Sequence, residues 1–269
     1  MKPRVLAAAQ SVSVAGDVPR NIERHLHFMH AAAACGVERL VFPELSLTGY
    51  EPDLARDSAL HPHDAVLDPL RAAAQELGLQ TIVGAPLWLE TDEAIGIGAL
   101  VFGTDGSCAR YIKQHLHPGE ERVFTPGGAA VALNAGPERT ALAICADFGR
   151  PEHAQQAASD GAALYAVGAL ITPGGYERDS ALLQQYAARH GMAVLLANHG
   201  GSTGGWQSAG RSALWAAGGR LVAAAPGDGD QLLIGTQIDG QWSGRLLAIA
   251  PLSQRPGAQC LSITCRTQL

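Results

Sequence analysis

Residues 141–148 read ALAICADF, so that four apolar residues run directly into Cys145. This pattern predicts a short buried strand over Thr140–Cys145, and the Pro151–Glu152 pair predicts that a helix begins soon afterwards. In α/β proteins, ligands bind beside the ends of such strands. Most cysteines that follow apolar residues are small buried hydrophobes, so an inert thiol is the alternative to a reactive one at Cys145.

A second apolar segment also ends at a reactive side chain. Leu40–Phe42 predicts a strand that Pro43 stops, and Glu44 follows at once. Apolar neighbours raise the pKa of a carboxyl group, which would make Glu44 a proton acceptor near neutral pH. The alternative is a capping or ion-paired carboxylate at the end of a strand.

The third such segment ends in a lysine. Tyr111–Ile112 is followed by Lys113, and the chain's 19 basic residues include only one other lysine, Lys2. A lysine in this place can donate to an oxyanion without losing its proton, whereas a solvated surface lysine is the alternative. If the three strand ends meet, Lys113 and Glu44 are expected to stabilise a Cys145 thiolate.

Around these segments, strands and helices alternate along the chain. We expect mixed sheets covered by helices, in two similar halves whose sheets pack face to face. The absence of a linker or a change in composition favours a single domain, 1–269. The predicted strands are Val5–Ala9, Gln80–Val83, Ala130–Leu133, Ala163–Val167, Ala193–Ala197 and Gln231–Ile238, with hairpins over Gly98–Ile112 and Ser212–Ala225; the predicted helices are Asn21–Ala34, Ala65–Leu77, Glu152–Ser159 and Glu177–His190.

Composition excludes several classes of protein. Hydrophobic residues make up 47% of the 269 residues and charged residues 16%, which suits a chain with a large core. The net charge of −6 argues against nucleic acid or an anionic membrane as the main partner. No apolar run is long enough for a membrane helix or a signal peptide, so we expect a cytoplasmic protein with reduced thiols.

Three stretches together resemble the nitrilase, or carbon–nitrogen hydrolase, superfamily. They are FPELSLTGY at 42–50, KQHLHPGEERVFTPG at 113–127 and ICADFGRPEH at 144–153. The resemblance extends over nearly the whole chain and implies a catalytic triad of Glu44 as base, Lys113, and Cys145 as nucleophile. It also implies that Glu120 supports this triad and that the backbone N–H of Ala146 shares the oxyanion with Lys113.

The resemblance further implies an α/β fold, the four-layer αββα sandwich of the nitrilases, assembled as a homodimer or higher homo-oligomer. The tail from about Pro251 is a candidate for the dimer interface. The implied reaction is cysteine-dependent hydrolysis of a small linear amide through a thioester, without a metal or organic cofactor. Ala146–Asp147 follows the cysteine, whereas the corresponding sequence in true nitrilases resembles Cys-Trp-Glu. This difference favours the amidase-like branches over nitrile hydrolysis.

Other functions stay open at this point. They are hydrolysis of an N-carbamoyl amine or a nitrile, binding of a small molecule without catalysis, and redox sensing by the thiol. We expect substrate contacts from Tyr50, Phe148, Asn198 and His199, although ordinary packing is the alternative for each. A metal site is not expected, because the histidines of the first predicted helix do not share one face and no Cys or carboxylate completes a set.

Overall fold

The computed structural model describes residues 3–90, 93–128, 138–250 and 252. Within these residues the strands form two sheets. The larger sheet contains, in spatial order, β12 (Gln241–Ala248), β11 (Gln231–Ile238), β1 (Arg4–Gln10), β2 (Arg39–Val41), β3 (Gln80–Trp88), β4 (Ile95–Phe102) and β5 (Cys108–Ile112). The smaller sheet contains β10 (Leu221–Ala224), β9 (Ala213–Trp215), β8 (Ala193–Asn198), β7 (Leu164–Ala169) and β6 (Thr140–Ile144).

Both sheets are mixed, as expected from the sequence, and they share one plan. β1, β2 and β3 run parallel, and the antiparallel strands β4 and β5 continue the sheet. In the smaller sheet β6, β7 and β8 run parallel, and β9 and β10 are antiparallel. The hairpin of β11 and β12 extends the larger sheet on the other side of β1.

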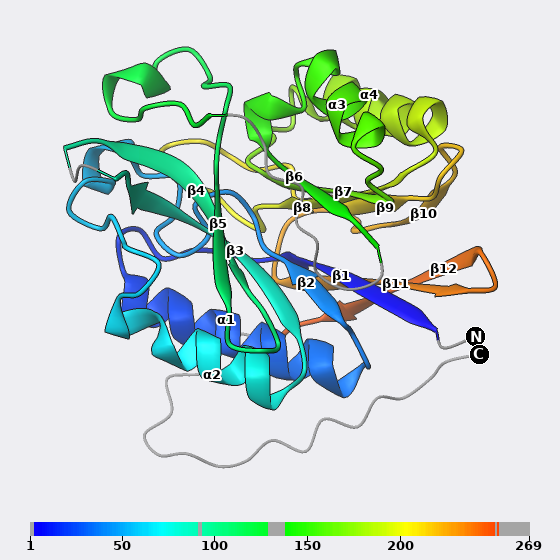
Figure 1. Ribbon diagram of the computed structural model, residues 1–269, viewed down its shortest axis with the longest axis horizontal. Coiled ribbons are helices and arrows are strands. Elements are labelled where there is room, and N and C mark those ends of the chain that lie inside the picture. Colours follow the sequence, from blue (N-terminus) through cyan, green and yellow to red (C-terminus); the bar gives the residue numbers. More distant parts are fainter. Residues whose placement is uncertain (1–2, 91–92, 129–137, 251, 253–269) are drawn as a thin grey trace.

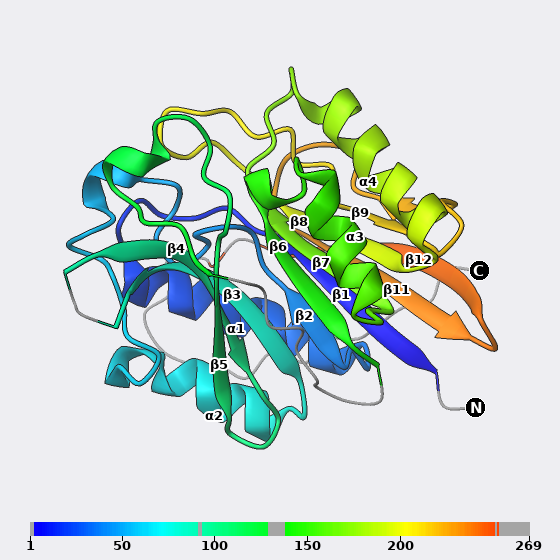
Figure 2. The ribbon, with the colours of Figure 1, turned by 45° about the horizontal axis from the view of Figure 1, so that its top comes forward.

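Helices cover the outer face of each sheet (Figures 1 and 2). α1 (Val18–Ala34) and α2 (Asp68–Glu76) lie on the larger sheet, and α3 (Pro151–Ser159) and α4 (Tyr176–His190) lie on the smaller one. α1 begins where the Asp17 carboxylate accepts a hydrogen bond from the backbone N–H of Arg20. α4 ends at Gly191, whose φ of 65° suits glycine.

Three layers of apolar side chains hold the four structural layers together. Phe28 and Leu70 pack between the larger sheet and its helices, and Ile82 and Leu195 pack between the sheets. Leu183 of α4 packs in the layer between the smaller sheet and its helices. Burial of each such side chain contributes about 1.5–3 kcal/mol. The αββα sandwich is therefore confirmed.

The sequence expectations missed one strand and shortened two others, of which one is β4, which begins at Ile95 rather than Gly98. β12 was not expected, and β3 continues to Trp88 rather than ending at Val83. The predicted strand Ala130–Leu133 lies outside the described residues, and so does the tail from Pro251, apart from Leu252. In the described part of the chain, no helix combines the length and the apolar character that crossing a membrane requires.

Candidate active site

The ends of β2, β5 and β6 bring Glu44, Lys113 and Cys145 together between the sheets. Lys113 Nζ donates a hydrogen bond of 2.7 Å to Oε1 of Glu44, and neither side chain is exposed. The Cys145 thiol interacts with the same Glu44 carboxylate, and it is close enough to Lys113 for the ammonium charge to lower the pKa of the thiol. The carboxylate, the amine and the sulfur therefore form one cluster, although they are far apart in the sequence.

Glu120 completes this cluster from the first turn of a short 3₁₀ helix, Glu120–Arg122. Its Oε1 accepts hydrogen bonds from Lys113 Nζ at 2.8 Å and from the Tyr50 hydroxyl at 2.7 Å. Its Oε2 accepts from the backbone N–H of His117 at 2.7 Å. Glu120 thus fixes the direction of the Lys113 ammonium, and Tyr50 borders the same cluster.

Burial and mutual charge shift the pKa values of the three groups. Burial raises the pKa of Glu44, and the neighbouring Lys113 ammonium opposes this shift. Burial alone would lower the pKa of Lys113, but the charges of Glu44, Cys145 and Glu120 outweigh it and raise that pKa. Lys113 therefore stays a cation with two carboxylates beside it.

The expectation of a stabilised thiolate is wrong for the resting site. Lys113 does lower the pKa of Cys145, but burial and the Glu44 carboxylate have larger effects and raise it. The first physical reason is burial, which takes water away from a thiolate, and the second is the charge of Glu44 and Glu120, which the single Lys113 cation does not offset. The raised pKa of Cys145 favours the thiol over the thiolate.

The backbone at Cys145 is held in an uncommon conformation. Its φ is 43°, in the left-handed region that residues other than glycine rarely adopt. The residue as a whole is partly exposed, and its sulfur lies 3.9 Å from the carbonyl oxygen of Leu170. Cys145 also begins a 3₁₀ turn, Cys145–Asp147, so the backbone changes direction at the sulfur.

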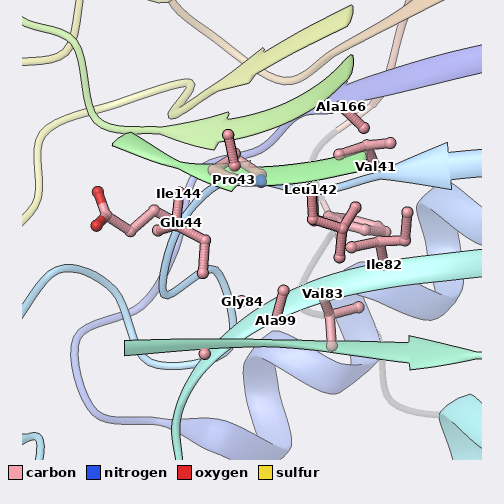
Figure 3. A pocket seen from close by; sticks show the side chains of 14 residues that line it. Val41, Pro43, Glu44, Ile82, Val83, Gly84, Ala99, Leu142, Ile144 and Ala166 are labelled. Carbon is pink, nitrogen blue, oxygen red and sulfur yellow. The ribbon is translucent and has the colours of Figure 1, made fainter. Parts of the chain in front are cut away.

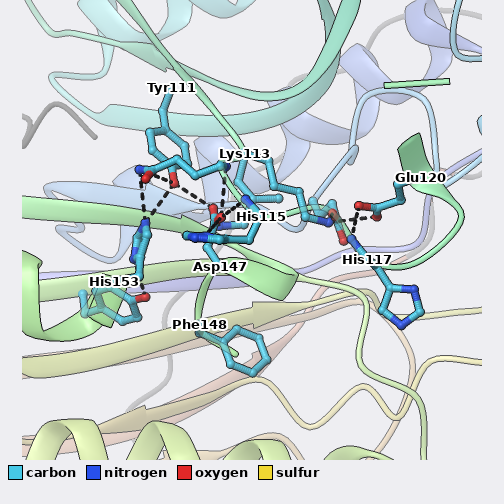
Figure 4. A network of polar contacts seen from close by, with 12 residues as sticks. Tyr111, Lys113, His115, His117, Glu120, Asp147, Phe148 and His153 are labelled. Atoms are coloured by element: carbon cyan, nitrogen blue, oxygen red, sulfur yellow. Dashed lines mark hydrogen bonds and ion pairs between the residues drawn. The ribbon is translucent and has the colours of Figure 1, made fainter. Parts of the chain in front are cut away.

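Asp147 fixes this turn, a role that the sequence analysis missed (Figure 4). Its Oδ2 accepts from the N–H of Ile144 at 3.0 Å and from the Tyr111 hydroxyl at 2.7 Å. Its Oδ1 accepts from the N–H groups of Gln114 and His115 at 3.0 and 2.8 Å. One buried carboxylate therefore joins the chain beside Cys145 to the chain on both sides of Lys113.

The turn that carries Glu44 passes between two glycines from opposite sheets. A Cβ atom on Gly84 of β3 would lie 2.3 Å from the Leu45 nitrogen, and one on Gly168 of β7 would lie 2.9 Å from the Phe42 carbonyl oxygen. An apolar cavity between the sheets reaches this turn (Figure 3), but its free volume of about 10 Å³ admits no more than a single water molecule. It is therefore a packing gap and not a substrate site.

The structure gives the other three predicted substrate-binding residues different surroundings. Phe148 is buried in the apolar layer under α3 and α4. The Asn198 side chain is buried and bonds to backbone groups of Ile171 and Gly210. The His199 ring is buried and bonds to the backbone oxygen of Glu44 at 2.6 Å. Their contact with substrate stays a prediction, whereas their structural contacts are clear.

The fold and the cluster define a member of the nitrilase superfamily. Residues 5–242 match the model of the carbon-nitrogen hydrolase family, and the chain belongs to this family. Within the described residues, no group of three or more His, Cys, Asp or Glu side chains is arranged to hold a metal ion.

Several known proteins are similar to this chain. The structure of a mutant amidase from Nesterenkonia sp. AN1 in complex with butyramide superimposes with a TM-score of 0.79 at 26% identity, over 87% of this chain and 90% of that one. An (R)-stereoselective amidase from Pseudomonas sp. is 27% identical over 73% of this chain and 72% of its own length. The glutamine-dependent NAD(+) synthetase of Thermotoga maritima is 28% identical over 56% of this chain, which spans only 27% of that protein.

Proposed function

We propose that the protein hydrolyses the C–N bond of a small linear amide and releases ammonia and a carboxylic acid. The observation that carries this proposal is the buried contact of Lys113 with Glu44 and Glu120, with the Cys145 thiol against Glu44. Similarity to amidases of 26–27% identity supports the amide as the substrate class. Another structure of the Nesterenkonia amidase contains acrylamide.

The first half of the reaction forms a thioester. Glu44 takes the proton of Cys145 while the sulfur attacks the carbonyl carbon, which forms the C–S bond and turns the carbonyl oxygen into an oxyanion. Lys113 and the N–H of Ala146 stabilise this oxyanion in a site with little water. Glu44 then gives its proton to the amide nitrogen, the C–N bond breaks and ammonia leaves.

The second half regenerates the thiol. Glu44 takes a proton from water, the resulting hydroxide attacks the thioester carbon, and the C–S bond breaks. The thiolate recovers the proton from Glu44, and the acid leaves. The raised pKa of Glu44 makes its carboxylate a stronger base, which suits a group that accepts a proton and later returns it.

A panel of substrates tests the proposal. Butyramide, acrylamide, an N-carbamoyl amine, a nitrile and L-glutamine are each incubated with the protein, and ammonia release is measured. L-Glutamine is included because two similar proteins are glutamine-dependent NAD(+) synthetases, of which the chain spans less than a third. We expect release from at least one linear amide and none from Cys145→Ala.

Mass spectrometry during turnover adds a direct observation. An acyl adduct on Cys145 is expected in the wild type and absent in Cys145→Ala. Carbon dioxide release would favour the N-carbamoyl amine instead. Full amide turnover by Cys145→Ala would refute the assignment of the nucleophile. We also expect a homo-oligomer, which light scattering of the same preparation measures.

A further inference from the structure

We propose that His199 is a positioning residue for Glu44 and acts through the backbone rather than through substrate. This inference rests on the proposed function, because it concerns how Glu44 is kept in place for proton transfer. The starting observation is that His199 Nε2 lies 2.6 Å from the carbonyl oxygen of Glu44 itself. The ring lies at the end of β8 in the smaller sheet, whereas Glu44 follows β2 in the larger one.

The chemistry of this contact fixes the state of the ring. A carbonyl oxygen only accepts, so Nε2 carries the hydrogen and donates it. Nδ1 is buried and has no hydrogen-bond partner among the described residues. Burial lowers the pKa of His199 to about 4, so the ring stays neutral in the working range of pH. A neutral donor of fixed tautomer can hold the Glu44 carbonyl without adding charge to the cluster.

His199 is itself fixed by its own surroundings. Its backbone carbonyl accepts a hydrogen bond of 2.6 Å from the Ser208 hydroxyl, and the Ser208 oxygen accepts from the N–H of Gly210 at 3.1 Å. The loop after β8 thereby fixes the backbone of His199, from which the ring projects. Two consecutive bonds then connect this loop to the backbone of Glu44.

A second buried histidine holds the same turn from α1. His25 Nδ1 donates to the carbonyl of Asn21 at 2.6 Å, so that Nε2 accepts from the Ser46 hydroxyl at 2.9 Å. The Ser46 oxygen accepts in turn from the N–H of Gly84 at 3.1 Å. The His25 ring also stacks on Phe42, with centroids 4.0 Å apart.

Histidines therefore bond to the residues on both sides of Leu45, His199 to Glu44 and His25 to Ser46. The φ of Leu45 is 51°. That conformation is strained for a leucine and persists only where its neighbours hold it. Glu44 has to exchange protons with three different atoms during the reaction, and a displacement of ~1 Å can cost about 10²-fold in rate. Holding its main chain at both ends of the turn limits this displacement.

The test compares two substrates in variants of His199. Glu44 has to protonate the departing ammonia of an amide, but a p-nitrophenolate leaves an ester without a proton. Displacement of Glu44 therefore lowers hydrolysis of butyramide more than hydrolysis of p-nitrophenyl butyrate. A smaller fraction of folded protein lowers both rates equally, so the ratio of the two kcat values separates positioning from simple structural damage.

We expect His199→Leu to lower the amide-to-ester ratio about tenfold or more, on the scale of a ~1 Å displacement, with a small change in KM. His199→Gln places an amide N–H near the position of Nε2 and should restore most of the ratio. His30→Leu, on the exposed face of α1, is the matched control and should leave the ratio unchanged. An unchanged ratio in His199→Leu, or equal losses in the Leu and Gln variants, would overturn the proposal.

If His199→Leu does not fold, His199→Asn takes its place, because its shorter side chain keeps a donor that cannot reach the Glu44 carbonyl. Equal ratios in the Asn and Gln variants would then refute the positioning role. Failure of the proposed function itself gives a different result. In that case the wild type hydrolyses none of the amides of the panel, whatever stands at position 199.

Discussion

Lys113 Nζ and Glu44 Oε1 lie 2.7 Å apart in a place where neither side chain is exposed to water. Taking two charges out of water costs several kcal/mol for each ion, and their attraction has to offset that cost. Glu120 strengthens the attraction, because it contacts the same ammonium at 2.8 Å. The cluster is thus stable only as a whole, and one cation serves two carboxylates.

Replacement of Lys113 by methionine should damage both folding and activity. Lys113→Met leaves two buried carboxylates without a cation, and loss of one partner of a buried pair costs about 3–5 kcal/mol. We expect a lower free energy of unfolding in urea and no measurable amide turnover. Lys113→Arg retains the charge but puts a wide guanidinium into a closed site. Retention of most of the activity in this variant would show that the site does not require the compact ammonium of lysine.

Asp147→Asn tests whether one carboxylate joins the segment of Cys145 to the segment of Lys113. An amide group in this place faces backbone N–H groups with a donor of its own, and each buried polar group left unsatisfied costs about 1–3 kcal/mol. We expect lower stability and a kcat reduced more than KM is raised, because Cys145 and Lys113 no longer keep their relative positions. Asp160→Asn, at the partly exposed residue that caps the end of α3, is the control. A variant with wild-type kcat would show that the two segments keep their places without Asp147.

The three strand ends could be predicted because each combines a local apolar pattern with a chemically distinctive residue. β12 could not, because seven of its eight residues are at least partly exposed, so that no regular alternation of buried and exposed residues marks it as a strand. The part of β3 beyond Val83 contains Gly84 and Pro86, and both of these residue types are uncommon inside strands. The strand continues there because it pairs with β4 as far as Trp88, and Gly84 leaves room for the Glu44 turn beside it.

Contacts between distant segments were the other limit of prediction. His199 follows a buried strand, and a substrate-binding role was predicted for it. Its ring bonds to the backbone oxygen of Glu44, 155 residues away in the sequence. Asp147 belongs to a recognisable motif, but its four donors come from segments that only the tertiary fold brings together. Periodicity and spacing do not carry this information.

The two buried histidines should make stability depend on pH below neutrality. Burial lowers the pKa of His25 to about 3 and that of His199 to about 4, from an ordinary value of 6.5. Below pH 6.5 the unfolded chain binds protons that the folded chain does not, so stability falls as the pH falls. Each histidine contributes up to about 1.4 kcal/mol per pH unit between 6.5 and its folded pKa.

Urea unfolding at pH 7 and pH 5 measures this dependence. His199→Gln removes one titrating group and should lose less stability than the wild type between these two values, by about 2 kcal/mol. His30→Gln is the control and should behave as the wild type. Equal pH dependence in wild type and His199→Gln would mean that His199 is not held neutral in the folded protein.

Gly84→Ala should be far more harmful than an ordinary glycine substitution. Its Cβ would lie 2.3 Å from the Leu45 nitrogen and 2.5 Å from the Pro43 carbonyl oxygen, and neither backbone atom can move without moving Glu44. Overpacking of this kind typically costs about 1–3 kcal/mol. We expect a lower free energy of unfolding together with a lower kcat in the fraction that stays folded. Gly174→Ala is the matched control, because a Cβ there meets nothing within 4 Å. Wild-type kcat in folded Gly84→Ala would show that the Glu44 turn can shift without consequence for the reaction.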